Sequence, residues 1–214
     1  MFDKTFRQFF VIIFSEDYLM KLCVYCGTFN PIHNAHIEVA KYVKANFDFD
    51  LILFIPAYKP PHKDIKNDAS MHRFNMVKAA ISGIKGFEIS DIEFKSEENS
   101  YTFNTITKLY EVYPEIEGKI NFIIGTDAFR KIQTWYRIND LKDLVEFVVF
   151  TRENNFMQED LDNLKITGYN FKYANMPYID ISSTEIRNKI KLNEDISGLV
   201  PQSVNSYIKR NGLY

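Results

Sequence analysis

The chain has 214 residues, of which 46% are hydrophobic, enough to build one α/β core of this length. Its formal net charge of −2 gives no broad electrostatic reason to bind nucleic acid or membranes. Its two cysteines do not form a disulfide framework, so we expect a reducing, cytoplasmic compartment. Composition leaves the formation of homo-oligomers open.

Residues 1–19 precede the part of the chain that carries motifs, and they include a short apolar block at 9–14. This block is far too short to span a bilayer, which takes about 20 apolar residues. It also lacks the longer apolar region and the small-residue cleavage site of a secretory signal. We interpret 1–19 as an N-terminal extension, with targeting left open, and 20–214 as a single domain.

A buried strand, a tight turn and a helix are predicted at the start of this domain. The apolar run 22–25 leads to Gly27, and helical spacing begins at 37–43. In an open α/β sheet such a turn lies at the carboxyl end of a strand, where ligands bind. His33 and His36 are three residues apart and would share one helix face, near N–H groups that attract phosphate. The segment therefore predicts a nucleotide site.

Zinc is the alternative for this segment, because Cys23, Cys26, His33 and His36 form a C-x-x-C…H-x-x-H pattern. The gap between the pairs is shorter than the roughly 12 residues that a zinc finger needs. Side chains alternate along a strand, so Cys23 and Cys26 would point to opposite faces. We therefore predict no metal-ligating residues.

A second strand over 51–55 is followed by a basic loop that contains a Pro-Pro pair. The loop carries Lys59, His62 and Lys63, and its prolines stiffen the backbone that presents them. A charged loop is usually a solvated surface. Because this one follows a strand of the nucleotide-binding half, we expect it to reach over phosphates. A helix is predicted over 71–81, with Arg73 near its start either in solvent or in the site.

Further strands are predicted over 87–92, 120–124 and 145–150, and a helix from Thr102 to about Val112. Thr102 is predicted as the N-cap of that helix. Asp127 follows a strand and Gly125, so it could accept a hydrogen bond from a ribose or cap the next helix.

Trp135 could belong to the core or stack on a flat heterocycle, and its polar, turn-like surroundings favour stacking. Residues 154–170 are polar and are predicted to be peripheral. Residues 182–185, S-S-T-E, fit a capping box. Arg187 lies one turn further on, with a guanidinium fork suited to phosphate. Residues 201–214 predict a helix, begun by proline, that packs on the sheet.

The alternation of strands and helices predicts a Rossmann-like, doubly wound α/β fold with a mostly parallel sheet and helices on both faces. The G-x-G-x-x-G fingerprint is absent, which disfavours a dehydrogenase.

Four motifs in this order resemble the nicotinate (nicotinamide) mononucleotide adenylyltransferases of the H-x-G-H nucleotidyltransferase superfamily. They are G-T-F-N-P-I-H-N-A-H at 27–36, K-P-P-H-K at 59–63, G-T-D at 125–127 and I-S-S-T-E-I-R at 181–187. The resemblance covers nearly everything from residue 20 to 214. Two departures each add a small side chain near the phosphates: Cys26 replaces a second glycine, and Ala35 replaces the glycine between the histidines.

The resemblance implies adenylyl transfer from ATP to nicotinate mononucleotide, giving nicotinic acid adenine dinucleotide and pyrophosphate in NAD biosynthesis. It implies that the catalytic residues are His33, His36 and Arg187. The implied ATP-binding residues are Gly27, Thr28, Phe29, His33, His36, Gly125, Asp127, Ile181, Ser182, Ser183 and Arg187. The implied substrate-binding residues are Asn30, Lys59, His62, Lys63, Thr102, Trp135 and Tyr136. Mg²⁺ would arrive with the triphosphate, which suits its preference for water and phosphate ligands.

The attacking 5′-phosphate is already anionic near neutral pH, so this reaction needs positioning and charge stabilisation rather than a general base. Other transferases that share the first motif are alternatives, namely pantetheine-phosphate adenylyltransferase and glycerol-phosphate cytidylyltransferase. The basic loop at 59–63 and the Trp135-Tyr136 pair disfavour both. A non-catalytic, nucleotide-binding regulatory module is a further alternative, which the intact His33, His36 and Arg187 disfavour.

Overall fold

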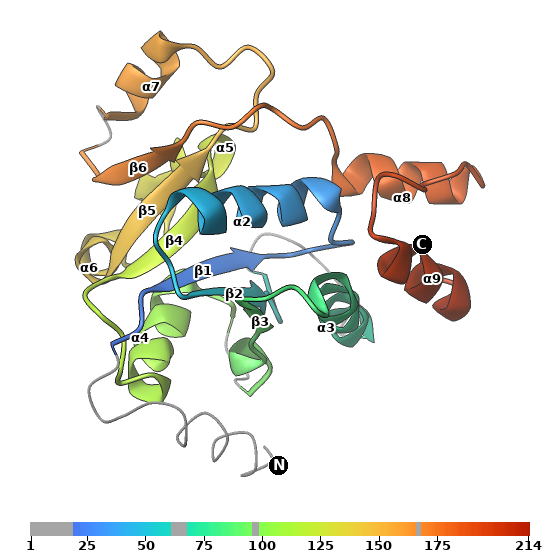
Figure 1. Cartoon of the computed structure of the whole chain (residues 1–214), viewed down its shortest axis with the longest axis horizontal. Helices are drawn as coiled ribbons and strands as arrows, with labels where there is room; N and C mark the ends of the chain where they lie inside the picture. Colours follow the sequence, from blue (N-terminus) through green and yellow to red (C-terminus); the bar gives the residue numbers. More distant parts are fainter. Residues whose placement is uncertain (1–18, 61–67, 96–98, 166–167) are drawn as a thin grey trace.

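The computed structural model describes residues 19–60, 68–95, 99–165 and 168–214. Its centre is a six-stranded sheet with the order β3-β2-β1-β4-β5-β6, and every pair of neighbouring strands is parallel (Figure 1). The strands are β1 Leu22–Gly27, β2 Leu51–Pro56, β3 Phe87–Ile89, β4 Ile120–Gly125, β5 Val145–Phe150 and β6 Phe171–Ala174.

Helices connect the strands and continue beyond the last one. They are α2 Asn34–Asn46, α3 Asp68–Ile81, α4 Thr102–Val112, α5 Thr126–Phe129, α6 Ile138–Leu144, α7 Gln158–Lys165, α8 Ser183–Lys191 and α9 Gln202–Asn211. Two short 3₁₀ helices, η1 Ile92–Lys95 and η2 Ile132–Thr134, lie between them.

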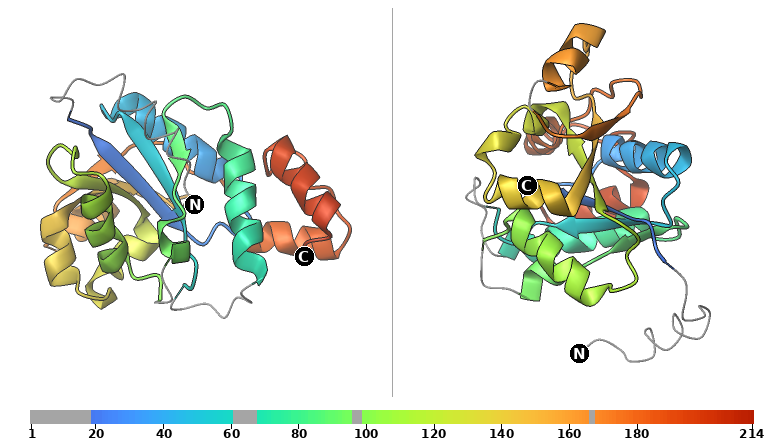
Figure 2. Two further views of the ribbon diagram at one scale, coloured as in Figure 1. Left: turned by 90° about the horizontal axis from the view of Figure 1, so that it is seen from below. Right: turned by 90° about the vertical axis from the view of Figure 1, so that its left-hand side faces the viewer.

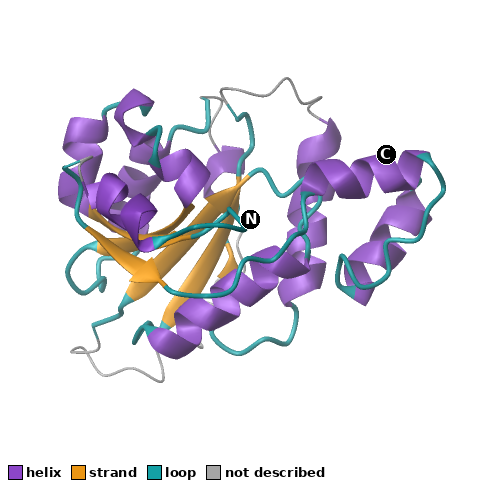
Figure 3. Cartoon of the chain, turned by 90° about the horizontal axis from the view of Figure 1, so that it is seen from above, coloured by secondary structure: helices purple, strands orange, loops and turns teal. Residues whose placement is uncertain are grey.

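The helices form a layer on each face of the sheet, because alternate strand residues bury apolar side chains on both sides. On β1, Cys23 and Tyr25 join the core that also receives α2, α3, α8 and α9. Leu22 and Val24 join the opposite core, together with α4, α5 and α6. Figures 2 and 3 show the two layers. The predicted doubly wound α/β fold is confirmed.

The strand order reverses between β1 and β4. From β1 the chain proceeds through β2 to β3 in one direction, and from β4 through β5 to β6 in the other. Loops that leave the carboxyl ends of β1 and β4 therefore diverge, which opens a crevice at a switch point. The turn after β1 and the segment 125–127 both lie at this place.

Several boundaries differ from the sequence predictions, and some elements were not predicted, among them α6. The strand predicted over 87–92 ends at Ile89, and η1 follows it. The polar region 154–170 contains α7, and β6 follows it, neither of which was predicted. Exposed helices with few apolar residues give a weak periodic signal, and a short edge strand gives little more.

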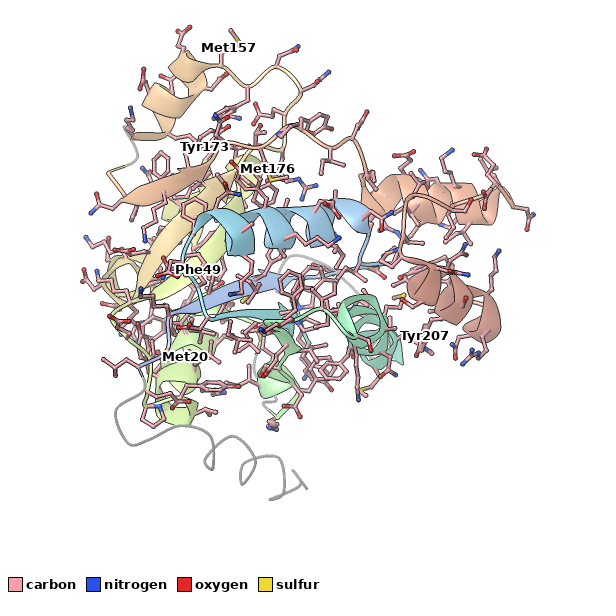
Figure 4. The ribbon with its side chains drawn as sticks, viewed as in Figure 1. Met20, Phe49, Met157, Tyr173, Met176 and Tyr207 are labelled. Carbon is pink, nitrogen blue, oxygen red and sulfur yellow. The ribbon has the colours of Figure 1, made fainter. Side chains whose placement is uncertain are left out.

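The C-terminal helix α9 packs against α3, so the prediction that the tail packs on the sheet itself is wrong. The Tyr207 hydroxyl hydrogen-bonds Nδ1 of His72 at 3.0 Å and Nδ2 of Asn75 at 3.1 Å. Ser203 Oγ donates to the carbonyl of Ala79 at 2.9 Å. Figure 4 labels Tyr207 at this contact.

Candidate functional site

The turn after β1 folds back on the end of its own strand. Phe29 has a left-handed backbone, with φ of 49°, and its ring lies over Gly27. A Cβ at Gly27 would approach Cζ of Phe29 to 2.9 Å, so glycine leaves room for the ring. The Phe29 ring packs edge-on against Tyr25 and His36 at centroid distances of 5.6 and 5.1 Å. The side chain of Phe29 therefore belongs to the core.

Side chains from distant elements bind the carbonyls of this turn. Arg73 of α3 donates from Nη1 to the carbonyl of Thr28 at 2.8 Å. Arg187 of α8 donates from Nη1 to the carbonyl of Asn30 at 2.8 Å. Ser183, at the start of α8, donates to the carbonyl of Pro31 at 2.8 Å. The turn is thus fixed by two helices that lie outside the β1–α2 unit.

His33 and His36 lie side by side at the start of α2, with ring centroids 3.6 Å apart. His33 is the N-cap in extended backbone conformation, so it precedes the helix, whereas the sequence placed both rings on one helix face. The backbone N–H of His33 donates to Nδ1 of His36 at 3.2 Å. Because Nδ1 of His36 accepts this bond, we assign the ring proton to Nε2, where it can be donated outward.

The His33 ring is only 3% exposed, and within the described part of the chain its Nδ1 has no hydrogen-bond partner. Burial, and to a smaller degree the nearby charge of Arg152, lower the pKa of His33 to about 3. The ring is therefore neutral near pH 7 and acts through hydrogen bonds rather than as a cation.

A cleft of about 340 Å³, open to solvent, adjoins the two histidines. It lies between the start of α2, the end of β5 and the segment 176–181, and Figure 4 labels Met176 in its wall. Its lining combines apolar and polar side chains: Tyr25, His33, Ala35, His36, Val39, Phe150, Thr151, Arg152, Met176, Pro177, Tyr178, Ile179 and Ile181. An apolar wall beside hydrogen-bond donors suits a ligand with a flat ring and an anionic group.

Arg152 is a residue of this cleft that the sequence analysis did not place in the site. Its Nε lies 4.0 Å from Oδ2 of Asp127, which is in the first turn of α5. A Cβ at Gly125 would lie 2.6 Å from Asp127 and 2.7 Å from Arg152, so glycine leaves room for both side chains. Asp127 does not cap α5, whose N-cap is Gly125, which excludes the capping alternative. The sequence feature that could have indicated Arg152 is its position, two residues after the strand predicted over 145–150.

Two of the residues predicted for the mononucleotide, Thr102 and Tyr136, lie at the start of α4. Thr102 is the first residue of α4 and Tyr101 is its N-cap, without a side-chain bond, so the prediction of Thr102 as the cap is wrong. The Tyr101 ring packs against the Tyr136 ring at a centroid distance of 4.6 Å, with the two planes tilted by 32°. Trp135 is half-buried and packs edge-on against Phe122 at 5.8 Å, so it belongs partly to the core.

Lys59 joins this region through its backbone. Its N–H donates to Oγ of Ser100 at 3.0 Å, and its carbonyl accepts from the N–H of Ser100 at 2.9 Å. The rest of the predicted basic loop, His62 and Lys63, lies outside the described residues.

A buried Arg–Glu network links the two halves of the site. Arg73, fully buried, donates from Nη2 to the carbonyl of Tyr58 at 3.2 Å, in addition to its bond to Thr28. Glu93 accepts from the N–H of Tyr58 at 3.2 Å and from Oγ1 of Thr105 in α4 at 2.7 Å. Burial raises the pKa of Glu93, although these hydrogen bonds act in the opposite direction. The sequence left Arg73 either in solvent or in the site. The structure buries it beneath the site, where it holds two backbone carbonyls.

The start of α8 has the predicted cap, because Oγ of Ser182 accepts from the N–H of Glu185 at 3.1 Å. Arg187 uses a second donor, Nη2, to reach Oγ1 of Thr184 at 3.2 Å. Ile181, just before this cap, lines the cleft. Within the described ranges no group of three or more His, Cys, Asp or Glu side chains could hold a metal ion. Nor do these ranges contain a helix that is long and apolar enough to cross a membrane.

Paired histidines at a helix start, beside a cleft at the switch point of a parallel sheet, define a nucleotide-binding α/β protein. The model of the cytidylyltransferase-like family matches residues 24–189. A probable nicotinate-nucleotide adenylyltransferase of Fusobacterium nucleatum is 38% identical over 191 residues, covering 89% of this chain and 98% of that protein. One of Staphylococcus epidermidis is 39% identical over 197 residues, covering 91% of this chain and 97% of its own length.

The chain therefore belongs to the nicotinate-nucleotide adenylyltransferases of the cytidylyltransferase-like family. The fold also matches a solved structure, the Plasmodium falciparum nicotinic acid mononucleotide adenylyltransferase complexed with NaAD. That match has a TM-score of 0.72 at 22% identity and covers 90% of this chain and 96% of the other.

Proposed function

We propose that this chain transfers the adenylyl group of ATP to nicotinate mononucleotide, with release of pyrophosphate, in NAD biosynthesis. A 5′-phosphate oxygen of the mononucleotide forms a bond to the α-phosphorus of ATP, and the bond from that phosphorus to the pyrophosphate breaks. The observation that carries the proposal is the His33–His36 pair beside the cleft, joined through Arg73 and Glu93 to the start of α4. Relatives of nearly the same length carry the name of this activity.

On the ATP side, the proposal assigns the flat adenine to the apolar part of the cleft and the phosphates to its histidine end. The Nε2–H of His36 donates to a phosphate oxygen. The Nδ1 of His33, which has no hydrogen-bond partner among the residues that the structure describes, is buried beside it. Arg152 adds positive charge at the cleft without being buried. Hydrogen bonds that strengthen as charge develops on the α-phosphate and the leaving pyrophosphate accelerate the transfer.

On the mononucleotide side, the pyridine ring stacks on Trp135 and its carboxylate takes donors from the Thr102 hydroxyl and the Tyr136 backbone N–H. The contact between the Tyr101 and Tyr136 rings supports this assignment, because it brings the start of α4 to the 135–136 segment. An amide in place of the carboxylate would face a donor with its own NH₂. That mismatch costs about 1–3 kcal/mol, roughly a 5- to 150-fold preference for nicotinate mononucleotide.

Mg²⁺ belongs to this proposal as part of the ATP substrate, because it prefers phosphate oxygens and water to a cage of protein ligands. A cytoplasmic location, expected from the cysteine usage, also belongs to it.

The test is a pyrophosphate-release assay with Mg·ATP and either pyridine mononucleotide, in which kcat/KM is measured for both. We expect turnover with a preference for nicotinate mononucleotide. Phosphopantetheine serves as the competing acceptor. Turnover with phosphopantetheine alone, or pyrophosphate release with none of the three, would overturn the proposal. Equal use of both pyridines would overturn the assigned donors only.

A further inference from the structure

Tyr214, the last residue of the sequence, reaches the nucleotide turn from the far end of the chain. Its hydroxyl donates to Oδ1 of Asn30 at 2.6 Å. Asn30 lies in the turn between β1 and α2, three residues before His33. We propose that Tyr214 is a positioning residue, which orients the Asn30 amide so that its NH₂ group faces a phosphate oxygen of a bound substrate.

The backbone of Asn30 is already fixed, so only its side chain is left to be oriented. Nη1 of Arg187 donates to the Asn30 carbonyl at 2.8 Å. An asparagine side chain has one oxygen that accepts and one NH₂ that donates, and the bonds around it decide which way they point. Tyr214 occupies the oxygen, whereas among the described residues the NH₂ of Asn30 has no partner. The group left for a ligand is therefore a donor, as an anionic phosphate requires.

The hydroxyl of Tyr214 is suited to act as a donor. Burial raises the pKa of Tyr214 well above its usual range, although the charges of Arg187 and Arg73 nearby oppose the shift. The phenol therefore keeps its proton at any pH at which the protein works. With the opposite amide orientation, Oδ1 would face the phosphate and repel it.

The fold holds Tyr214 in place through the contact between α9 and α3. α9 ends at Asn211, and its C-cap, Gly212, has a left-handed backbone. The N–H of Leu213 then donates to the carbonyl of Ile208 at 3.2 Å, and both Leu213 and Tyr214 pack against the core. The packing of α9 on α3, followed by this turn, explains how the last residues of the sequence reach a site built on β1.

The experiment replaces Tyr214 by phenylalanine, which removes the hydroxyl and keeps the ring. Loss of one oriented hydrogen bond predicts a fall in kcat/KM of about five- to tenfold, with the melting temperature nearly unchanged. Tyr207→Phe is the matched control. It removes a hydroxyl of α9 whose hydrogen-bond partners, among the described residues, are the α3 side chains of His72 and Asn75, so kcat/KM should stay at the wild-type value.

A double-mutant cycle with Asn30→Ala separates positioning from general packing. If Tyr214 acts through Asn30, Tyr214→Phe causes no further loss in the Asn30→Ala background. Additive losses, or an unchanged Tyr214→Phe enzyme, overturn the inference. The KM values distinguish the phosphate involved: a rise for ATP points to the triphosphate, and a rise for nicotinate mononucleotide points to its 5′-phosphate.

The inference rests on the proposed function. Calorimetric titration distinguishes a failure of the inference from a failure of the proposed function. Mg·ATP and nicotinate mononucleotide are titrated separately into the wild-type, Tyr214→Phe and Tyr207→Phe proteins. A five- to tenfold weaker affinity for one of the two ligands in Tyr214→Phe alone supports the positioning role even if no transfer occurs. A wild-type protein that binds both ligands without transfer overturns only the proposed function, whereas equal affinities in all three proteins overturn the role of Tyr214.

Discussion

Acidification gives a direct test of the buried, neutral state of His33. The ring is 3% exposed, and burial together with Arg152 lowers its pKa to about 3, compared with 6.5 in an unperturbed histidine. The folded protein thus binds this proton less tightly than the unfolded chain does. The contribution of His33 to stability is therefore complete above pH 6.5 and is lost as the pH falls toward 3.

The size of the effect follows from the two pKa values. Between pH 7 and pH 5 the unfolded chain gains about 0.7 of a proton at His33, whereas the folded protein gains almost none. The free energy of unfolding should therefore fall by about 2 kcal/mol from this residue alone. At pH 4 the loss reaches about 3 kcal/mol. Other titrating groups add their own pH dependence, so the wild-type protein must be compared with a variant that lacks this one.

His33→Gln is that variant, because glutamine is polar and does not titrate. Denaturation in urea at pH 7 and pH 5 gives the free energy of unfolding of both proteins. We expect the wild-type protein to lose about 2 kcal/mol more than His33→Gln over this interval. Circular dichroism at pH 7 checks that the variant is folded. Equal losses in the two proteins would show that His33 is not a buried neutral ring.

Three further predictions concern catalysis, the internal network and the start of the domain. His36→Ala should lower kcat by at least roughly 10²-fold and weaken ATP binding far less, and near-normal turnover in a folded variant would contradict its role. Glu93→Ala should cost about 2–4 kcal/mol in denaturant unfolding. The Tyr58 N–H loses its acceptor, and the Thr105 hydroxyl loses the nearer of its two acceptors, since the carbonyl of Tyr101 lies at 3.2 Å. Glu93→Gln should cost less because its amide oxygen still accepts. Stability that is equal in all three proteins would refute that account. A chain that starts at Met20 should match the full chain in melting temperature and turnover. Met20 is buried, and its backbone hydrogen-bonds the backbone of Glu115 and Glu117. An insoluble or inactive shortened protein would show that residues 1–19 are needed for the core.

The fold was largely predictable because its strands are buried on both faces. Central strands of a parallel sheet are continuous apolar runs, and β1, β2, β4 and β5 all appear in the sequence within a residue or two of their ends. The edge strand β6, with the sequence F-K-Y-A, carries a lysine and only four residues, so it resembles a loop. The helix α7 resembles a loop for a similar reason, since six of its eight residues are polar or charged and two are leucine.

The candidate site could be predicted where its residues are neighbours in the sequence. It could not be predicted where folding brings together residues that are far apart in the sequence. The Gly27–His36 motif predicts a phosphate-binding turn, because its glycine, its histidines and the start of a helix lie next to one another in the sequence. Arg73 and Glu93 carry no such signal, because a charged residue on a helix is usually solvated. Their importance arises only when α3 and η1 place both in the interior around the Tyr58 peptide. Tyr214 is the extreme case, at the opposite end of the chain from its partner.

The way in which the turn is held explains why a neutral histidine suits it. The carbonyls of Thr28, Asn30 and Pro31 already accept hydrogen bonds, so the turn cannot reorganise when phosphates arrive. Such a preorganised site stabilises developing charge without a reorganisation cost at the moment of transfer. A protonated His33 would be a buried charge without a counter-charge until the ligand supplies one. Keeping the ring neutral avoids that cost in the folded protein, and an anionic phosphate placed beside His33 would raise its pKa. On the proposed assignment of the phosphates to His33, their binding in acid solution would therefore be coupled to uptake of a proton by this ring.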